Sequence, residues 1–279
     1  MTLSVALAVL LAALLHASWN ALLKSGNDIL LDTAAIIIGG GAIAVPLVFV
    51  VAVPAPASWP YIAASAFVHI AYYLLMVNAY RTGELSLVYP LMRGTAPMIT
   101  AVFGIVLLQE WPGPLAWLGI ALISLGVFAL ALRSVDHTPS SAAVAFALGN
   151  AAVIAVYTII DGRGARLAQD AFGYICWLFV VDAVPFTLIV AFVRRGTFVR
   201  AMYERRWRGL VGGGLSAAAY AISVWAMTKA PVALVASLRE TSVLFAALIG
   251  TRILRERLSP RRWAGAFAIV LGALAIKLA

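Results

Sequence analysis

The sequence predicts an all-α integral membrane protein with ten transmembrane helices arranged as two inverted five-helix repeats. Two observations predict this class. The 279-residue chain is 64% hydrophobic and only 11% charged, with a mean hydropathy of +1.01, which is too apolar for a water-facing surface. A set of identical residues also recurs at a fixed offset of 146 positions, which indicates a duplicated bundle.

Ten apolar windows lie along the chain, each close to the roughly 20 residues that a helix needs to cross the hydrocarbon core. They cover residues 3–23, 29–53, 59–80, 85–108, 114–133, 142–161, 172–193, 207–228, 231–254 and 261–278. Turn residues or charges separate them, at Lys24–Asp28, Pro54–Ser58, Arg81–Glu84, Gln109–Gly113, Arg133–Ser141, Gly162–Ala171, Arg194–Arg206, Lys229–Ala230 and Arg255–Pro260. The first window lacks the basic start of a signal peptide, since no Lys or Arg precedes Lys24.

The recurring identities join the third to fifth windows with the eighth to tenth. They include Arg93/Arg239, Thr95/Thr241, Glu110/Glu256, Pro114/Pro260, Trp117/Trp263 and Gly119/Gly265. Each half holds five windows, and because five is odd the second copy enters the membrane from the opposite side. The predicted domains are residues 1–135, the N-terminal repeat, and 140–279, the inverted C-terminal repeat.

The formal charge of +9 would indicate nucleic-acid binding in a soluble protein. Here most basic residues lie in short connections, so membrane orientation explains them and no nucleic-acid partner is predicted. Fourteen of them follow the odd-numbered windows or flank those connections, against four on the other side. The positive-inside rule then places the richer side in the cytoplasm and both termini outside.

Arg93 and Arg239 stand about nine residues inside their windows, where a charge costs about 2.5–3.5 kcal/mol on insertion scales. Both are therefore predicted to face the bundle interior, and inverted symmetry is expected to bring them to one pocket. A guanidinium group there would bind a carboxylate or phosphate. The alternative is internal pairing that only locks helices together.

Glu240 and Asp182 are the acids deepest in their predicted spans, and Asp161 lies near a helix end. They are candidates for proton coupling or for ion pairs with the arginines. Polar side chains at helical spacing predict the pocket wall, namely His16 and Asn20, His69 and Tyr73, Tyr157, and Tyr220. Interfacial aromatic belts and hydrogen-bonded packing are the alternatives for these residues.

Pro90 and Pro97 lie on either side of Arg93. A proline-interrupted span is a pointer to a transporter site, because freed backbone groups can line it, and a plain kink is the alternative. Glu110 and Glu256 precede the fifth and tenth windows, where a helix-dipole role accounts for them.

With these residues in view, the chain resembles the drug/metabolite transporter superfamily, specifically its EamA-type ten-helix members. Two stretches carry the resemblance: Glu110, Pro114, Trp117 and Gly119 leading into ALISLG at 121–126, and Glu256, Pro260, Trp263 and Gly265 leading into AIVLG at 268–272. The opening LLAALLHASWNALLKSG at 10–26 is similar to EamA-type openings, some of which are associated with phosphonate utilisation. The resemblance implies transport, and termini in the cytoplasm, opposite to the charge bias.

The function predicted is secondary active transport of a small organic solute by alternating access around a midplane site, by export or exchange. Amino acids, carboxylates and phosphonate-like anions are favoured. No P-loop, HExxH, GxSxG or metal-ligand cluster occurs, so neither an enzyme nor a cofactor or metal is predicted. A non-transporting membrane subunit and, less favoured, a membrane-embedded enzyme are the alternatives. The expected location is the inner membrane, as a monomer or a homodimer.

Overall fold

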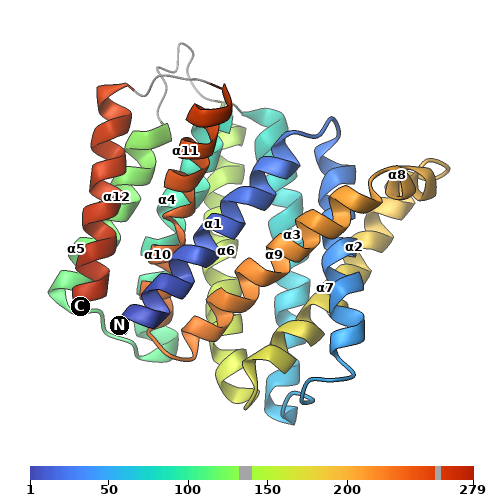
Figure 1. The fold of residues 1–279 in the computed structure, drawn as a ribbon, viewed down its shortest axis with the longest axis horizontal. Helices are drawn as coiled ribbons and strands as arrows, with labels where there is room; N and C mark the ends of the chain where they lie inside the picture. The colour runs from blue at the N-terminus through green and yellow to red at the C-terminus, as the bar shows by residue number, and fades with distance from the viewer. Residues whose placement is uncertain (84, 132–139, 255–258) are drawn as a thin grey trace.

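The computed structural model describes residues 1–83, 85–131, 140–254 and 259–279, and the regular structure in these ranges is helical. In lipid only helices and closed barrels satisfy every backbone group, so long apolar runs fold this way. The elements in order are α1 (Leu3–Lys24), α2 (Ile29–Leu47), η1 (Pro56–Ser58), α3 (Trp59–Thr82), α4 (Leu85–Phe103), η2 (Gly104–Leu108), α5 (Pro114–Ala131), α6 (Ser141–Leu167), α7 (Ala171–Val193), α8 (Phe198–Glu204), α9 (Arg206–Met227), α10 (Val232–Arg239), α11 (Ser242–Leu254) and α12 (Pro260–Leu278) (Figure 1).

Eight helical segments in the described ranges are long and apolar enough to cross a membrane, and a shorter apolar helix covers Pro114–Leu130. The predicted all-α membrane class is therefore confirmed. Ten crossings remain a prediction. The two termini lie side by side at one end of α5 and α12 (Figure 1).

Two predicted boundaries are wrong. The second helix ends at Leu47 instead of residue 53, because a turn follows in which the N–H groups of Val50 and Val51 both donate to the Leu47 carbonyl oxygen. The sixth helix continues to Leu167, past the break predicted at Gly162. Gly162 is a close packing position, because a Cβ there would lie 2.6 Å from a methyl carbon of Val232. The short helix α8, inside the connection predicted at Arg194–Arg206, was not anticipated.

The helix contacts correspond between the two halves when each helix is replaced by its counterpart in the other half. α3 packs on α6 and α1 packs on α9, while α4 packs on α6 and the α10–α11 segment packs on α1. α5 lies against α12, and α2 lies against α7. Each contact is thus matched by its counterpart from the other half, which is the pattern that a duplicated bundle produces.

One pair of matched contacts differs. α2 and α9 meet backbone to backbone: a Cβ built on Gly39 would lie 2.0 Å from the carbonyl oxygen of Gly209, and one on Gly213 would lie 2.2 Å from the nitrogen of Gly40. The counterpart pair, α7 and α3, meets through side chains, including Tyr73 and Phe186, whose ring centroids are 4.7 Å apart. Small residues let α2 and α9 approach closely.

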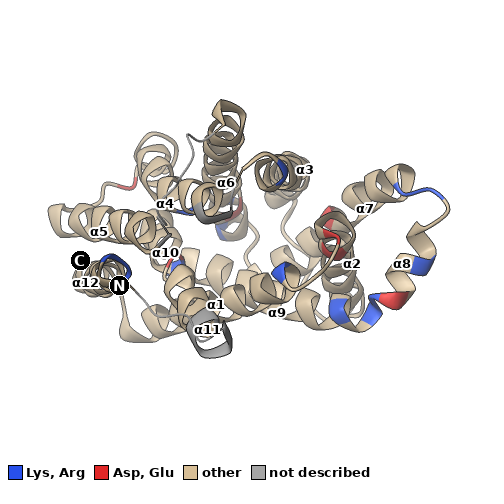
Figure 2. Cartoon of the chain, turned by 90° about the horizontal axis from the view of Figure 1, so that it is seen from above, with Lys and Arg blue, Asp and Glu red and all other residues tan. Residues whose placement is uncertain are grey.

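Ion pairs stabilise the end of the bundle at which α2 begins. Arg194 Nη2 lies 2.8 Å from Asp28 Oδ2, and Arg205 Nε lies 3.2 Å from the buried Asp32 Oδ1. Arg208 also donates to the carbonyl oxygen of Leu22 at 2.9 Å. Basic residues gather along α8 and the start of α9 (Figure 2). These contacts tie the α7–α9 connection to α1 and α2.

At the opposite end of the bundle, Glu110 does not cap α5, the helix that follows it. Its Oε2 accepts the backbone N–H of Val232, the first residue of α10, at 2.8 Å. Its Oε1 lies 2.6 Å from Arg166 Nη2, whose guanidinium also donates to the carbonyl oxygens of Met227 and Ala230. The helix-dipole role expected at α5 therefore acts on α10, across the two halves. Glu256 lies outside the described residues.

We expect Gly213→Ala to destabilise the protein by about 1–3 kcal/mol or more, because the added methyl group overlaps the backbone of α2. Thermal unfolding in detergent measures the loss. Gly149→Ala is the matched control, since its Cβ meets nothing closer than 3.9 Å and Ala favours a helix by roughly 0.5–1 kcal/mol over Gly. Equal melting temperatures for the two variants would contradict the close α2–α9 contact.

Candidate functional site

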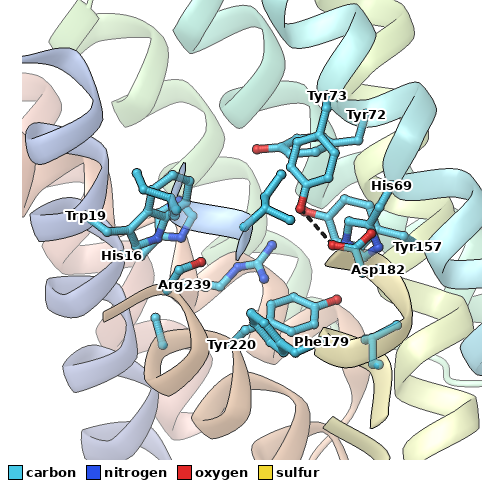
Figure 3. A pocket seen from close by; sticks show the side chains of 15 residues that line it. His16, Trp19, His69, Tyr72, Tyr73, Tyr157, Phe179, Asp182, Tyr220 and Arg239 are labelled. Carbon is cyan, nitrogen blue, oxygen red and sulfur yellow. Dashed lines mark hydrogen bonds between the residues drawn. The ribbon is translucent and has the colours of Figure 1, made fainter. Parts of the chain in front are cut away.

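A cavity of about 80 Å³ lies inside the bundle between α1, α2, α3, α6, α7 and α9, beside the end of α10 (Figure 3). Seven of the predicted site residues line it: His16, His69, Tyr73, Tyr157, Asp182, Tyr220 and Arg239. A smaller adjacent cavity is lined by Asn20 and Arg93, and it shares His16 and Tyr72 with the larger one. Asp161 and Glu240 line neither. The two arginines thus reach neighbouring cavities.

The Arg93 guanidinium is paired. Its Nε lies 2.8 Å from Glu240 Oε2, and the two side chains are only 4% and 2% exposed. Arg93 comes from α4 and Glu240 from the turn after α10, so the pair joins the two halves. Because the pair is removed from water, each charge depends on the other. Arg93 Nη2 has no hydrogen-bond partner and remains a free donor within the described structure.

Arg239 differs from its repeat counterpart. It is 3% exposed and lines the larger cavity, but no carboxylate of a described residue lies within ion-pair distance. Its guanidinium carbon lies 6.0 Å from the ring centroid of Tyr220. The neighbouring Glu240 points elsewhere because successive helical residues differ by about 100° around the axis. Glu240 therefore binds Arg93, whereas Arg239 faces the cavity.

The helix carrying Arg239 is interrupted at that residue. α10 ends at Arg239 and α11 starts at Ser242. The Leu238 carbonyl oxygen accepts both the backbone N–H of Thr241 at 3.1 Å and Thr241 Oγ1 at 2.8 Å, so it stays hydrogen-bonded through the interruption. The interruption contains no proline; its sequence signal is the run of polar residues from Arg239 to Ser242 in an apolar window.

The predicted proline-related interruption does not occur. α4 continues as one helix through Pro90 and Pro97, and changes to the wider π-type turn only at η2. The prolines therefore leave the helix around Arg93 intact.

The two remaining acids have hydroxyl partners. Asp161 is fully buried and accepts from Tyr174 at 2.8 Å and from Tyr220. Asp182 Oδ2 accepts from Tyr73 at 3.0 Å, while its Oδ1 is buried without a hydrogen-bond partner. Asp161 therefore fixes the position of Tyr220 without lining the cavity itself, whereas Asp182 lines the cavity.

Aromatic rings form much of the cavity wall. His69 stacks on Tyr157 at 4.5 Å between centroids, and its Nδ1 lies 2.9 Å from the carbonyl oxygen of Ser65. Tyr72 meets Tyr157 edge-on at 5.6 Å. Asn20 donates instead to the His16 carbonyl oxygen in its own helix, at 2.8 Å.

Sequence reasoning missed the apolar part of the wall, namely Ile36, Ile37, Leu178 and Phe179. These residues lie within continuous apolar runs of α2 and α7. Leu178 and Phe179 precede Asp182 by four and three residues, and Ile36 and Ile37 follow Thr33 by three and four, so helical spacing from these polar residues is the signal that could have found them.

A polytopic helical bundle built from two matched halves, with buried charges around an internal cavity, defines a membrane carrier. The chain matches the model of the EamA-like transporter family over residues 3–132 and 141–278, and it belongs to that family. The two matched segments coincide with the two halves of the bundle. The protein is accordingly a multi-pass transporter of the cell membrane, as predicted.

Two individual proteins are similar to it. The "Uncharacterized transporter YwfM" of Bacillus subtilis (strain 168) is 25% identical over 224 residues, covering 80% of this chain and 74% of the relative. A solved structure described only as "Crystal structure of protein" has a TM-score of 0.78 at 17% identity, and covers 100% of this chain and 98% of its own. The second likeness concerns the fold alone.

We expect Glu240→Gln to cost about 3–5 kcal/mol of stability, because it leaves the Arg93 charge buried without a counter-charge. Arg93→Met should cost less, since the carboxyl of Glu240 can take up a proton whereas a guanidinium keeps its own. Unfolding in detergent micelles measures both. Arg200→Gln, in the exposed Arg200–Glu204 pair, is the control and should change nothing measurable. A wild-type unfolding curve for Glu240→Gln would contradict the pairing.

Proposed function

We propose that the protein is a secondary active transporter that carries small organic solutes with an anionic group. The observation that carries the proposal is the Arg239 guanidinium, which is buried, lines the cavity and has no acidic partner among the described residues. A buried cation inside a bilayer is normally paired or hydrogen-bonded. A carboxylate or phosphonate group on the solute would supply the missing partner in bidentate geometry.

The size of the cavity favours a small solute. A single water needs about 10–15 Å³ on the same measure, so a cavity of about 80 Å³ holds roughly five to eight water-sized groups. This range fits short amino acids, carboxylates and phosphonates. The aromatic wall contributes apolar contact beside the charge.

The matched packing of the two halves supports alternating access by two inverted repeats with ten crossings, in which the α10–α11 segment makes one interrupted crossing. The backbone contact of α2 with α9 and the side-chain contact of α7 with α3 are counterparts in the two halves. Such a difference is expected in a carrier held in one of its two conformations. Exchange of the two arrangements would move access to the cavity from one face to the other.

Arg93 takes a different part from Arg239 in this proposal. Its pairing with Glu240 fixes the turn that follows Arg239, so Arg93 acts on the solute by positioning Arg239. Solute export or exchange is the favoured mode, driven by a gradient of ions, protons or the solute itself. The sequence contains no phosphate-binding loop of the P-loop type that would couple transport to ATP.

A ligand screen tests the proposal. Detergent-solubilised protein should show higher melting temperatures with a subset of short amino acids, carboxylates or phosphonates. Arg239→Gln should weaken that response about 10- to 150-fold in affinity, since a hydrogen bond to a charged group contributes about 1.5–3 kcal/mol. Lys229→Gln, an exposed cation of the α9–α10 connection, is the control.

Uptake into proteoliposomes by the same variants distinguishes a carrier from a non-transporting subunit. Arg239→Gln should lose uptake of the solute that stabilises the wild-type protein. An unchanged melting response together with unchanged uptake would remove Arg239 from the site.

A further inference from the structure

We propose that the cavity contains a second subsite, at Asp182 and Tyr73, that binds a cationic amine, so that the transported solute is a small zwitterion. This inference rests on the proposed function, in which Arg239 binds the anionic group. It adds a recognition element of opposite charge on the other side of the same cavity.

Asp182 carries the inference. The side chain comes from α7, is 8% exposed and lines the cavity. Tyr73 occupies one carboxylate oxygen, whereas Oδ1 is buried with no hydrogen-bond partner, and no basic side chain of the described residues pairs with it. A carboxylate in this position within a membrane is normally paired. The missing partner is a donor that enters the cavity.

The surroundings of Asp182 suit an ammonium group. Tyr73 and Tyr157, with the stacked His69, present aromatic rings beside the carboxylate (Figure 3). Aromatic faces attract cations, and more strongly where water is excluded. The Tyr73 hydroxyl also fixes the carboxylate, which leaves the second oxygen oriented for a ligand.

Arg239 and Asp182 do not neutralise each other. Both line the same cavity, yet no ion pair joins them, and Figure 3 shows the guanidinium and the carboxylate facing across it. A solute with an anion at one end and an amine at the other satisfies both groups at once. A solute with an anion alone leaves Asp182 without a partner, which disfavours it. The small cavity limits the spacer between the two charges to a few atoms.

Matched analogues test the second subsite without any mutation. The probes are β-alanine, propionate and N-acetyl-β-alanine, with 2-aminoethylphosphonate and ethylphosphonate as the phosphonate pair. Apparent affinities come from melting-temperature titrations of the full-length protein. We expect the amine-bearing member of each set to bind at least 10-fold more tightly than its deaminated or acetylated counterpart.

Asp182→Asn should reduce the affinity of the amine-bearing probe to that of its deaminated partner, about 10-fold or more, and leave the deaminated probe unchanged. Tyr73→Phe keeps the carboxylate and removes its anchor, so it should give a smaller loss in the same direction and serves as the second variant if Asp182→Asn does not fold. Glu204→Gln, on the exposed face of α8, is the matched control.

The outcomes separate the two proposals. Equal binding of amine-bearing and deaminated probes by the wild-type protein, with loss of both in Arg239→Gln, would overturn the amine subsite and leave anion transport standing. An equal loss of both probes in Asp182→Asn, with pH-dependent binding of propionate, would make Asp182 a proton carrier and also overturn the inference. No response to any probe in the wild-type protein would count against both.

Discussion

The arrangement of the site depends on one buried ion pair. Arg93 and Glu240 lie in the core of a bundle where a lone charge is strongly disfavoured, so the first half must meet the second at this point. This requirement fixes the rotation of the segment around residue 240. Arg239, the preceding residue and the last of α10, is then directed toward the cavity. One arginine of the repeat is thus paired, and in the proposed function the other binds the solute.

The two ends of the bundle are held by different chemistry. At the end where α2 begins, Asp28 and Asp32 pair with Arg194 and Arg205, and further along the helix the glycine backbones of α2 and α9 lie in contact. At the other end Glu110 joins the start of α10 to Arg166 of α6. The two halves thus match in the order of their long helices and differ in the interactions that stabilise each end. The proposed alternating-access mechanism requires such a difference, because the two conformations close different faces.

Much of the helical arrangement follows from the sequence, because a bilayer demands about 20 apolar residues per crossing and leaves few alternatives to a helix. The deep arginines, the acids and the stripe of His69 and Tyr73 were visible for the same reason: polar groups in apolar runs are rare. The rest depends on contacts between distant segments. No local sequence pattern predicts that Glu240 pairs with Arg93, that Glu110 caps α10, or that Gly162 lies inside a helix against Val232. The apolar wall residues Leu178 and Phe179 lie at helical spacing from Asp182, but they stand in an apolar run that also suits contact with lipid.

The Arg93–Glu240 pair also bears on how the protein is made. Arg93 is synthesised well before Glu240. In the sequence 146 residues separate Arg93 from Arg239, and Glu240 is the residue after Arg239. Until the later segment arrives, the earlier half holds a guanidinium without its acid. During synthesis the Arg93 guanidinium must therefore lie close to water or to the insertion machinery. The first half can insert fully into the lipid only after the second half supplies Glu240.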